Sequence, residues 1–193
     1  YRDRAVTLSW EAPEDLSGID GYYYTIDRKV DTTPEPETAL FTQQKSLTFE
    51  LTEDGLWYLH LVAKDNAGNF SKRAGHYALH IDTKVSKPSI TSPTHPDQNE
   101  WYSKTKAVFQ FTSPSDLSGV AGYYYTFTDD PRVQPAAQGA SYIERADINL
   151  DIPRDGVHYL SVLCADKAGN ISDEPTVYTV RLDTHVDAPE LSS

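Results

Sequence analysis

Residues 15–25 read DLSGIDGYYYT, and residues 116–126 read DLSGVAGYYYT. When the 193-residue chain is shifted by 101 positions against itself, the match continues on both sides of this stretch, with 28 identities in 92 aligned pairs and no net insertion. A fixed period of this length indicates two copies of one domain, each long enough to enclose its own core. We therefore expect two domains, residues 1–88 and residues 89–193.

The two copies do not cover the repeat equally. Tyr1 aligns with Tyr102, so the first copy has no counterpart of residues 92–101. At the other end, Ser192 and Ser193 align with Thr91 and Ser92. We expect the chain to be a monomeric fragment, two repeats cut from a longer array.

Each copy consists of short runs of alternating apolar and polar residues separated by turn residues, which is typical of an all-β sandwich. In the first copy the predicted strands are residues 5–11, 21–27, 39–43, 46–51, 57–64 and 76–82. Because side chains alternate between the two faces of a strand, Leu59, Leu79 and Ile81 are expected in a core. The fold class predicted from the pattern is all-β, with two tandem sandwiches.

The composition excludes several classes of partner. The chain has 17 basic and 29 acidic residues, a formal net charge of −12. Such a charge disfavours both the phosphate backbone of nucleic acids and anionic lipid surfaces. No apolar run is long enough for insertion into a membrane. The single cysteine, Cys164, cannot form an internal disulfide and is expected in the core, with a reactive thiol as the alternative.

Several motifs resemble a known family. Val6-Thr7-Leu8-Ser9-Trp10, followed by Ile19-Asp20-Gly21-Tyr22, resembles a fibronectin type III domain, which has a tryptophan on its second strand and a glycine–tyrosine pair opening its third. The turn Asp65-Asn66-Ala67-Gly68-Asn69 and the closing Ile81-Asp82-Thr83 are similar to tandem immunoglobulin-like repeats of bacterial cell-surface proteins. The resemblance implies two fibronectin type III-like sandwiches from a large bacterial protein at the cell surface or outside the cell, with the periplasm as an alternative.

The sequence departs from the family pattern at the tyrosine corner, where a tyrosine hydroxyl normally bonds to the backbone upstream. The first copy has Trp57 at this position and the second has His158, each followed by a tyrosine. Phe111 also replaces the tryptophan of the second strand. The sandwich is still expected, but the corner hydrogen bond is left open.

No catalytic motif is present. The chain contains no serine-hydrolase elbow, metalloprotease motif, phosphate loop or dinucleotide fingerprint. His76 and His80 lie four residues apart on a predicted strand, too far apart to share one ion, whereas His60 could approach His80 across adjacent strands. We expect these histidines to be exposed sheet residues, with a zinc site as the alternative. The expectation is a protein without enzymatic activity or cofactor.

Two loops at the same end of each sandwich carry oxygen-bearing side chains. Their first interpretation is turn chemistry, in which Asp and Ser side chains bond to nearby backbone. The alternative is calcium, which takes six to eight oxygen ligands. The candidate ligands are Asp15, Ser17, Asp65 and Asn69 in the first copy, and Asp97, Asp116, Asp166 and Asn170 in the second. Asn69 and Asn170 also fit the N-glycosylation pattern, which we interpret as turn sequence.

One sheet face is the last candidate site. Alternation places Tyr23 and Tyr58 on the outward side of the first copy, and Tyr124 and Tyr159 on that of the second. Tyrosines combine an apolar ring with a polar hydroxyl, so neighbouring pairs could bind a glycan or a protein partner. Ordinary cross-strand pairing on a sheet is the competing explanation.

Three classes of function compete. The first is a non-catalytic extracellular spacer, because core and turn residues recur between the copies while outward residues differ. The second is an adhesin-like binding module that uses the tyrosine face or the loop ends. The third, an enzyme, lacks any supporting motif.

Overall fold

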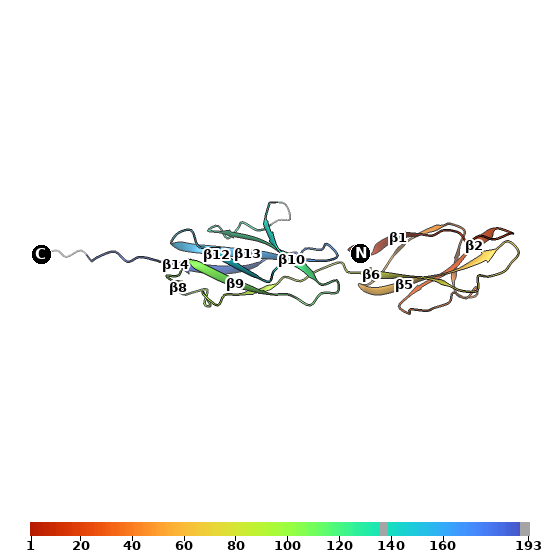
Figure 1. Cartoon of the computed structure of the whole chain (residues 1–193), viewed down its shortest axis with the longest axis horizontal. Coiled ribbons are helices and arrows are strands. Elements are labelled where there is room, and N and C mark those ends of the chain that lie inside the picture. The colour runs from red at the N-terminus through yellow and green to blue at the C-terminus, as the bar shows by residue number, and fades with distance from the viewer. Residues whose placement is uncertain (136–138, 190–193) are drawn as a thin grey trace. The chain divides into compact units, whose positions relative to one another are not determined.

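The computed structural model of the chain describes residues 1–135 and 139–189, and every regular element in these ranges is a β-strand. The chain divides into two compact units, the first ending at Thr83 and the second beginning at Lys84. Their strands are labelled in Figure 1. Within the described ranges, no helix has the length and apolar character needed to span a membrane.

The boundary lies five residues before the expected one at position 88. Val85 is 7% exposed and belongs to the hydrophobic core of the second unit. The Thr176 hydroxyl donates to the carbonyl oxygen of Pro88, and the Lys87 ammonium lies 3.4 Å from a carboxylate oxygen of Glu174. Residues 84–88 therefore belong to the second unit, although their sequence shows no strand pattern.

The first unit consists of two antiparallel sheets. One has the strand order β3-β2-β5-β6, and the other contains β1 and β4. The strands are β1 (Ala5–Ser9), β2 (Ile19–Asp27), β3 (Leu40–Thr42), β4 (Ser46–Glu50), β5 (Gly55–Asp65) and β6 (Gly75–Ile81). All six correspond to the predicted strands, with ends that differ by two residues at most.

The second unit repeats this arrangement and adds a strand to each sheet. Its sheets have the orders β11-β10-β13-β14-β8 and β12-β9-β7. The strands are β7 (Ser89–Thr91), β8 (Trp101–Tyr102), β9 (Lys106–Thr112), β10 (Val120–Thr128), β11 (Ser141–Ile143), β12 (Asp147–Asp151), β13 (Gly156–Asp166) and β14 (Thr176–Leu182). β8 pairs with β14 in parallel, and β7 pairs with β9.

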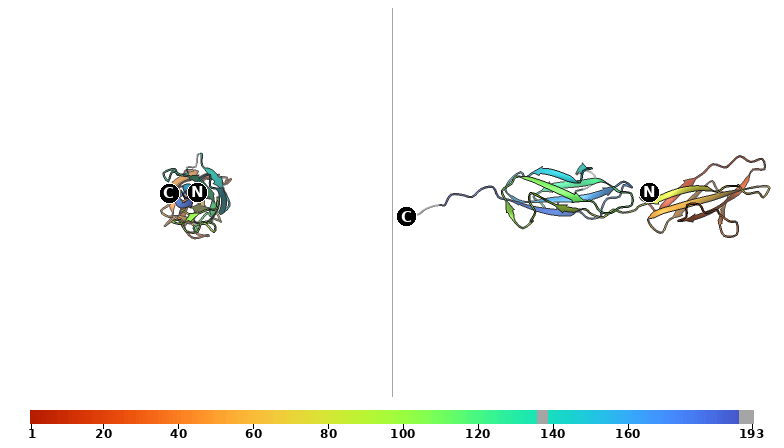
Figure 2. Two further views of the ribbon diagram at one scale, coloured as in Figure 1. Left: turned by 90° about the vertical axis from the view of Figure 1, so that its left-hand side faces the viewer. Right: turned by 60° about the horizontal axis from the view of Figure 1, so that its bottom comes forward.

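In each unit the two sheets face one another across an apolar interior (Figure 2). This strand order is that of a fibronectin type III-like, immunoglobulin-like β-sandwich. Leu79 and Ile81 are buried in the first core, and Phe109, Leu160 and Cys164 are fully buried in the second. Burial raises the pKa of the Cys164 thiol to about 11, so the cysteine is a neutral core residue as expected.

Candidate functional site

An aromatic patch lies on the outward face of the β3-β2-β5-β6 sheet. It consists of Tyr23, Phe41 and Phe70. The Tyr23 ring centroid is 5.0 Å from that of Phe41 and 5.8 Å from that of Phe70. Phe41 is 43% exposed and Phe70 44% exposed, so two large apolar rings face solvent side by side with a tyrosine.

Backbone pairing and one glycine position these rings. Tyr23 is directly opposite Phe41 in the β2–β3 register, and Phe70 is held by an isolated bridge to Lys64. A Cβ at Gly21 would come within 2.4 Å of the Phe41 ring and 2.7 Å of the Thr42 carbonyl oxygen. Only glycine therefore lets the Phe41 ring lie over the backbone of β2.

The second unit has a matching patch, which consists of Tyr124, Tyr142 and Ile171. The Tyr124 and Tyr142 ring centroids are 4.9 Å apart, and Tyr142 is 43% exposed. Ile171 forms the bridge to Ala165 that Phe70 forms to Lys64. Gly122 leaves room for the Tyr142 ring as Gly21 does for Phe41. Partial burial, with smaller effects of Glu144 and Tyr124, raises the pKa of Tyr142, so its hydroxyl remains a donor at neutral pH.

The expected pairing of Tyr23 with Tyr58, and of Tyr124 with Tyr159, is wrong. Tyr23 is opposite Val62, four residues along β5 from Tyr58, a separation of about 13 Å. Tyr58 stacks instead on His60, with ring centroids 6.0 Å apart. Alternation placed the tyrosines on the correct face, but their positions along the strands depend on the cross-strand register. The exposed partners of the first tyrosine of each pair, Phe41 and Tyr142, were missed because their pairing with the tyrosines depends on the cross-strand register.

His60, His76 and Asp27 form a polar cluster in which His60 is buried, whereas His76 and His80 are exposed, as expected. His60 is fully buried, its Nδ1 lies 2.7 Å from His76 Nδ1, and its Nε2 lies 3.2 Å from Asp27 Oδ1. The register pairs His60 with His76, so the expected approach to His80 is wrong. The Thr32 hydroxyl donates to Asp27 at 2.6 Å, which ties the loop after β2 to this cluster.

This histidine cluster also affects the ionisation of Asp27. Partial burial disfavours its charged form, but hydrogen bonds from Thr32, the Lys29 amide and His60 hold the pKa of Asp27 below its usual value. The second unit has Ser161 and Val177 at the positions of His60 and His76. The cluster therefore belongs to the first unit alone.

The loop residues proposed as calcium ligands make turn hydrogen bonds. The Ser17 amide and hydroxyl both donate to Asp15 Oδ1 at 2.8 Å. The Asn69 amide donates to one oxygen of Asp65 and its Nδ2 to the other, at 2.7 and 2.8 Å. Asp15, Asp65 and Asn69 line one hollow of about 180 Å³. The positive φ of Gly68, 89°, completes the turn.

The second unit repeats these turns, but one of the residues expected to be a calcium ligand lies elsewhere. Asn170 bonds to Asp166 as Asn69 does to Asp65, and carboxylate oxygens of Asp116 and Asp166 lie within 4.8 Å of one another. Asp97 does not join them. Its neighbour Gln98 accepts from the Thr179 amide, and Thr179 pairs with Tyr159, about 23 Å along β13 from Asp166. Calcium binding stays a prediction, which a higher melting temperature in millimolar calcium than in chelator would support.

A hydrogen-bonded clamp closes the end of each unit. The Thr83 amide and hydroxyl donate to the Asp54 carboxylate, at 3.2 and 3.0 Å, and Arg4 donates to the same carboxylate at 3.1 Å. Burial opposes ionisation, but these donors hold the pKa of Asp54 below its usual value. In the second unit the Thr184 amide and hydroxyl donate to Asp155 at 3.1 and 2.9 Å. The clamp explains why Asp54-Gly55 and Asp82-Thr83 recur in the second copy, at the same separation, as Asp155-Gly156 and Asp183-Thr184.

The corner hydrogen bond is present in both units. Trp57 Nε1 donates to the Glu53 carbonyl oxygen at 2.9 Å. His158 Nε2 lies 2.8 Å from the Arg154 carbonyl oxygen, which fixes a proton on that nitrogen. Two side chains of different chemistry thus replace the tyrosine, each bonding to the carbonyl four residues upstream.

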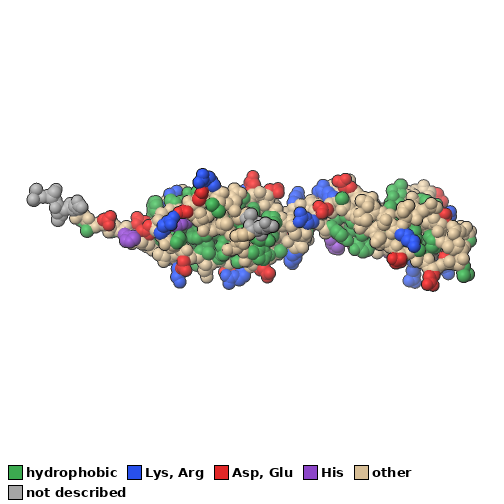
Figure 3. All heavy atoms as spheres, turned by 90° about the horizontal axis from the view of Figure 1, so that it is seen from above, with side chains coloured by type: hydrophobic (Ala, Val, Ile, Leu, Met, Phe, Trp, Pro, Cys, Tyr) green, Lys and Arg blue, Asp and Glu red, His purple; other side chains and the backbone are tan. Residues whose placement is uncertain are grey.

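Charged side chains of both signs are interspersed on the face shown in Figure 3. Asp20 and Lys64, beside the aromatic patch, form an ion pair at 2.8 Å. The hydrogen bond from Lys64 lowers the pKa of Asp20.

No protein-family model matches the chain, and no curated protein sequence matches it. Among solved structures, the chain is similar to fibronectin(III)-like modules of Clostridium thermocellum CbhA, with 12% identity, a TM-score of 0.42, and coverage of 99% of this chain and 92% of that chain. It is also similar to a two-domain fibronectin type III segment of chicken tenascin, with 15% identity, a TM-score of 0.41, and coverage of 93% of both. The fold assignment rests on the strand order of each unit.

Proposed function

We propose that this chain is a non-catalytic spacer, two modules of a multi-repeat protein located outside the cell or at the cell surface. The observation that carries the proposal is the repeated clamp, in which Asp54 holds Thr83 and Asp155 holds Thr184. Both clamps fix the segment through which the chain leaves a sandwich. A module that transmits tension needs its exit segment tied to its own fold.

The pattern of differences between the units supports the same function. Turn bonds, clamps and corner bonds recur with nearly equal distances, whereas His60 and His76 are replaced by Ser161 and Val177. A ligand site shared by both units would need recurring outward side chains. Apart from the aromatic patch, what recurs is the set of interactions that holds each sandwich together.

Single-molecule force spectroscopy on the 193-residue chain tests the spacer. We expect two separate unfolding events, one for each unit, because each has its own core and clamp. Asp54→Ala should lower the force of one event and Asp155→Ala that of the other. One joint event, or unchanged forces in both variants, would contradict the proposal.

A second candidate function, binding of a glycan or protein, is favoured by the aromatic patch. It is an outward feature that recurs in both units, as Tyr23 with Phe41 and as Tyr124 with Tyr142. Exposed rings can stack on the apolar face of a sugar or of a partner side chain. At the proposed location outside the cell, the aromatic patch would be accessible to such partners.

A glycan array probed with the intact chain tests this second function. We expect any saturable signal to be lost in the double variant Phe41→Ala, Tyr142→Ala. Tyr58→Ala, on the same sheet face but outside the aromatic patch, is the matched control and should retain it. An equal loss in the control would assign the signal to another surface.

A further inference from the structure

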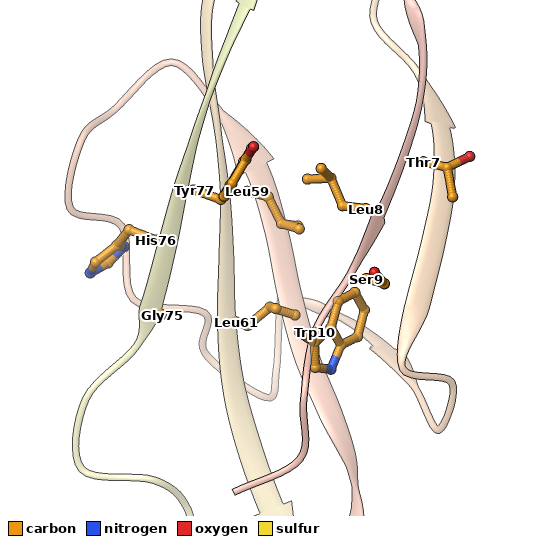
Figure 4. Close-up of a pocket in the computed structure, with 9 residues that line it drawn as sticks. All are labelled: Thr7, Leu8, Ser9, Trp10, Leu59, Leu61, Gly75, His76 and Tyr77. Atoms are coloured by element: carbon orange, nitrogen blue, oxygen red, sulfur yellow. The ribbon is translucent and has the colours of Figure 1, made fainter.

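Two imidazole rings face one another on the outward side of the β3-β2-β5-β6 sheet. His60 and His76 are directly opposite in the β5–β6 register, and their Nδ1 atoms lie 2.7 Å apart. Leu59 and Leu61, on either side of His60 in the sequence, point to the other side of the sheet from His76 (Figure 4). Because side chains alternate along a strand, His60 lies on the same face as His76. The register thus brings two ring nitrogens to one point of this face.

Hydrogen bonds determine which nitrogen of His60 carries the proton. Partial burial opposes ionisation of Asp27, but its hydrogen bonds hold its pKa below the usual value, so it is a carboxylate at neutral pH. Its Oδ1 lies 3.2 Å from His60 Nε2, and a carboxylate can only accept. Neutral His60 therefore has its proton on Nε2 and a lone pair on Nδ1. This lone pair is aimed at Nδ1 of His76, which donates to it.

The carboxylate that orients His60 is itself held in place. The Thr32 hydroxyl donates to Asp27 Oδ2 at 2.6 Å, and the Lys29 amide donates to Oδ1 at 2.8 Å. His60 is 0% exposed, so its ring is enclosed on all sides. In protein metal sites, a ligating histidine commonly donates its other N–H to a carboxylate, which fixes the tautomer and makes the ligating nitrogen more basic. Asp27 stands in this relation to His60.

We propose that His60 and His76 bind one divalent transition-metal ion of the zinc type through their Nδ1 atoms, with Asp27 as a positioning residue. Imidazole nitrogen is a preferred ligand of such ions, whereas magnesium and calcium prefer oxygen. The ion takes the place of the proton that the two Nδ1 atoms share. His76 loses this proton from Nδ1 and takes one from water on Nε2, so no net proton is released.

The geometry needs one small movement. Zinc binds histidine nitrogen at about 2.0–2.1 Å, so two ligands of a tetrahedral site lie about 3.3 Å apart. The two Nδ1 atoms must therefore separate beyond their present 2.7 Å. His76 is exposed, and its ring can move while that of His60 stays in place. Water takes the remaining positions on the solvent side.

The site belongs to the first unit and is independent of the spacer function. At the positions of Asp27, His60 and His76, the second unit has Thr128, Ser161 and Val177. His80 lies four residues along β6 from His76, about 13 Å away, and is too distant to share the ion. We therefore expect one ion for each chain.

Isothermal titration of the intact chain with zinc chloride tests the site. We expect saturable binding of one zinc ion for each chain and no binding of magnesium. His60→Gln and His76→Gln should each abolish zinc binding. His80→Gln, on the same strand but outside the cluster, is the matched control and should keep the wild-type affinity. Absence of zinc binding to the wild-type chain would overturn the proposal, and so would zinc binding that survives in both cluster variants.

Scanning calorimetry separates loss of the site from loss of the fold. Zinc should raise the melting temperature of the first unit alone, because an ion that binds only the folded state stabilises it. In EDTA, His76→Gln should melt close to the wild type, since the substituted side chain is exposed, and zinc should no longer shift it. A zinc-dependent shift that remains in His76→Gln would contradict the site.

The positioning role of Asp27 has its own test. Asp27→Asn keeps an oxygen that can accept from His60 Nε2 but removes the negative charge, so the zinc affinity should fall about tenfold. Magnesium titration and the melting temperature in EDTA serve as its controls. An unchanged zinc affinity in Asp27→Asn would overturn the role of the carboxylate.

Discussion

At position 158 a histidine ring nitrogen forms the hydrogen bond that a tyrosine hydroxyl forms at the tyrosine corner of immunoglobulin-like sandwiches. His158 is 2% exposed, and its Nε2 bonds to the Arg154 carbonyl oxygen, as Trp57 Nε1 bonds to Glu53. A hydrogen bond of this kind contributes about 0.5–1.5 kcal/mol net to stability. The two units show that either an indole or an imidazole N–H at this position can form it.

His158→Phe should destabilise the second unit by about 0.5–1.5 kcal/mol, because it keeps a ring but removes the donor. His158→Gln keeps an N–H of similar reach and should lose less. Urea unfolding followed by circular dichroism measures both changes. Equal stabilities of the wild-type and phenylalanine proteins would show that the corner bond contributes nothing.

We expect His95 to make the second unit sensitive to acid. It is 1% exposed, and burial lowers its pKa despite the hydrogen bond to the Lys104 carbonyl oxygen. The residue is therefore neutral in the fold, so the unfolded chain binds more protons once the pH falls below about 6.5. The stability that depends on neutral His95 is present above this pH and is lost as the pH falls toward the lowered pKa.

We expect the free energy of unfolding of the second unit to fall between pH 7 and pH 5.5. His95→Gln should show a smaller fall over the same interval, because glutamine does not titrate. Urea unfolding at the two pH values checks this. An equal pH dependence in both proteins would assign the effect to other groups.

At the scale of the elements, the irregular geometry of β2 and of β10 depends on one glycine in each strand. Both strands contain a register shift, between Ile19 and Gly21 and between Val120 and Gly122. At this irregularity an aromatic ring of the neighbouring short strand lies over the glycine, and a Cβ at Gly122 would come within 2.4 Å of the Tyr142 hydroxyl and 2.5 Å of the Ile143 carbonyl oxygen. The glycine thus couples the strand to the aromatic patch.

Gly122→Ala should destabilise the second unit by about 1–3 kcal/mol, since backbone atoms must move to accept the methyl group. Gly75→Ala is the matched control, because a Cβ there meets nothing within 4 Å. Thermal melts of the two variants provide the comparison. A Gly122→Ala protein as stable as the Gly75→Ala protein would mean that the ring over the glycine moves freely.

On the scale of the whole molecule, residues 1–135 and 139–189 form two hydrophobic cores. Leu59 is 2% exposed in the first unit, and Leu160 is fully buried in the second. Their contacts do not depend on one another, so each unit is expected to unfold by its own transition. A chain built in this way is expected to lose one unit at a time under stress.

Leu160→Ala should destabilise the second unit by about 2–5 kcal/mol through loss of buried apolar contacts and leave the first unit unchanged. Leu59→Ala should do the reverse. Differential scanning calorimetry of the intact chain resolves the two transitions. A simultaneous shift of both transitions in either variant would indicate that the units unfold as one body.

The sequence by itself determined the repeat, the six strands of the first unit and the core residues, because these depend on local alternation and turn chemistry. It also identified the turn residues Asp65 and Asn69, whose partners are near in sequence. The tertiary structure alone decided that His60 meets His76, that Tyr23 meets Phe41, and that Asp97 lies far from Asp166. These contacts depend on cross-strand register, and a shift of two residues in register changes every neighbour without altering the pattern of alternation.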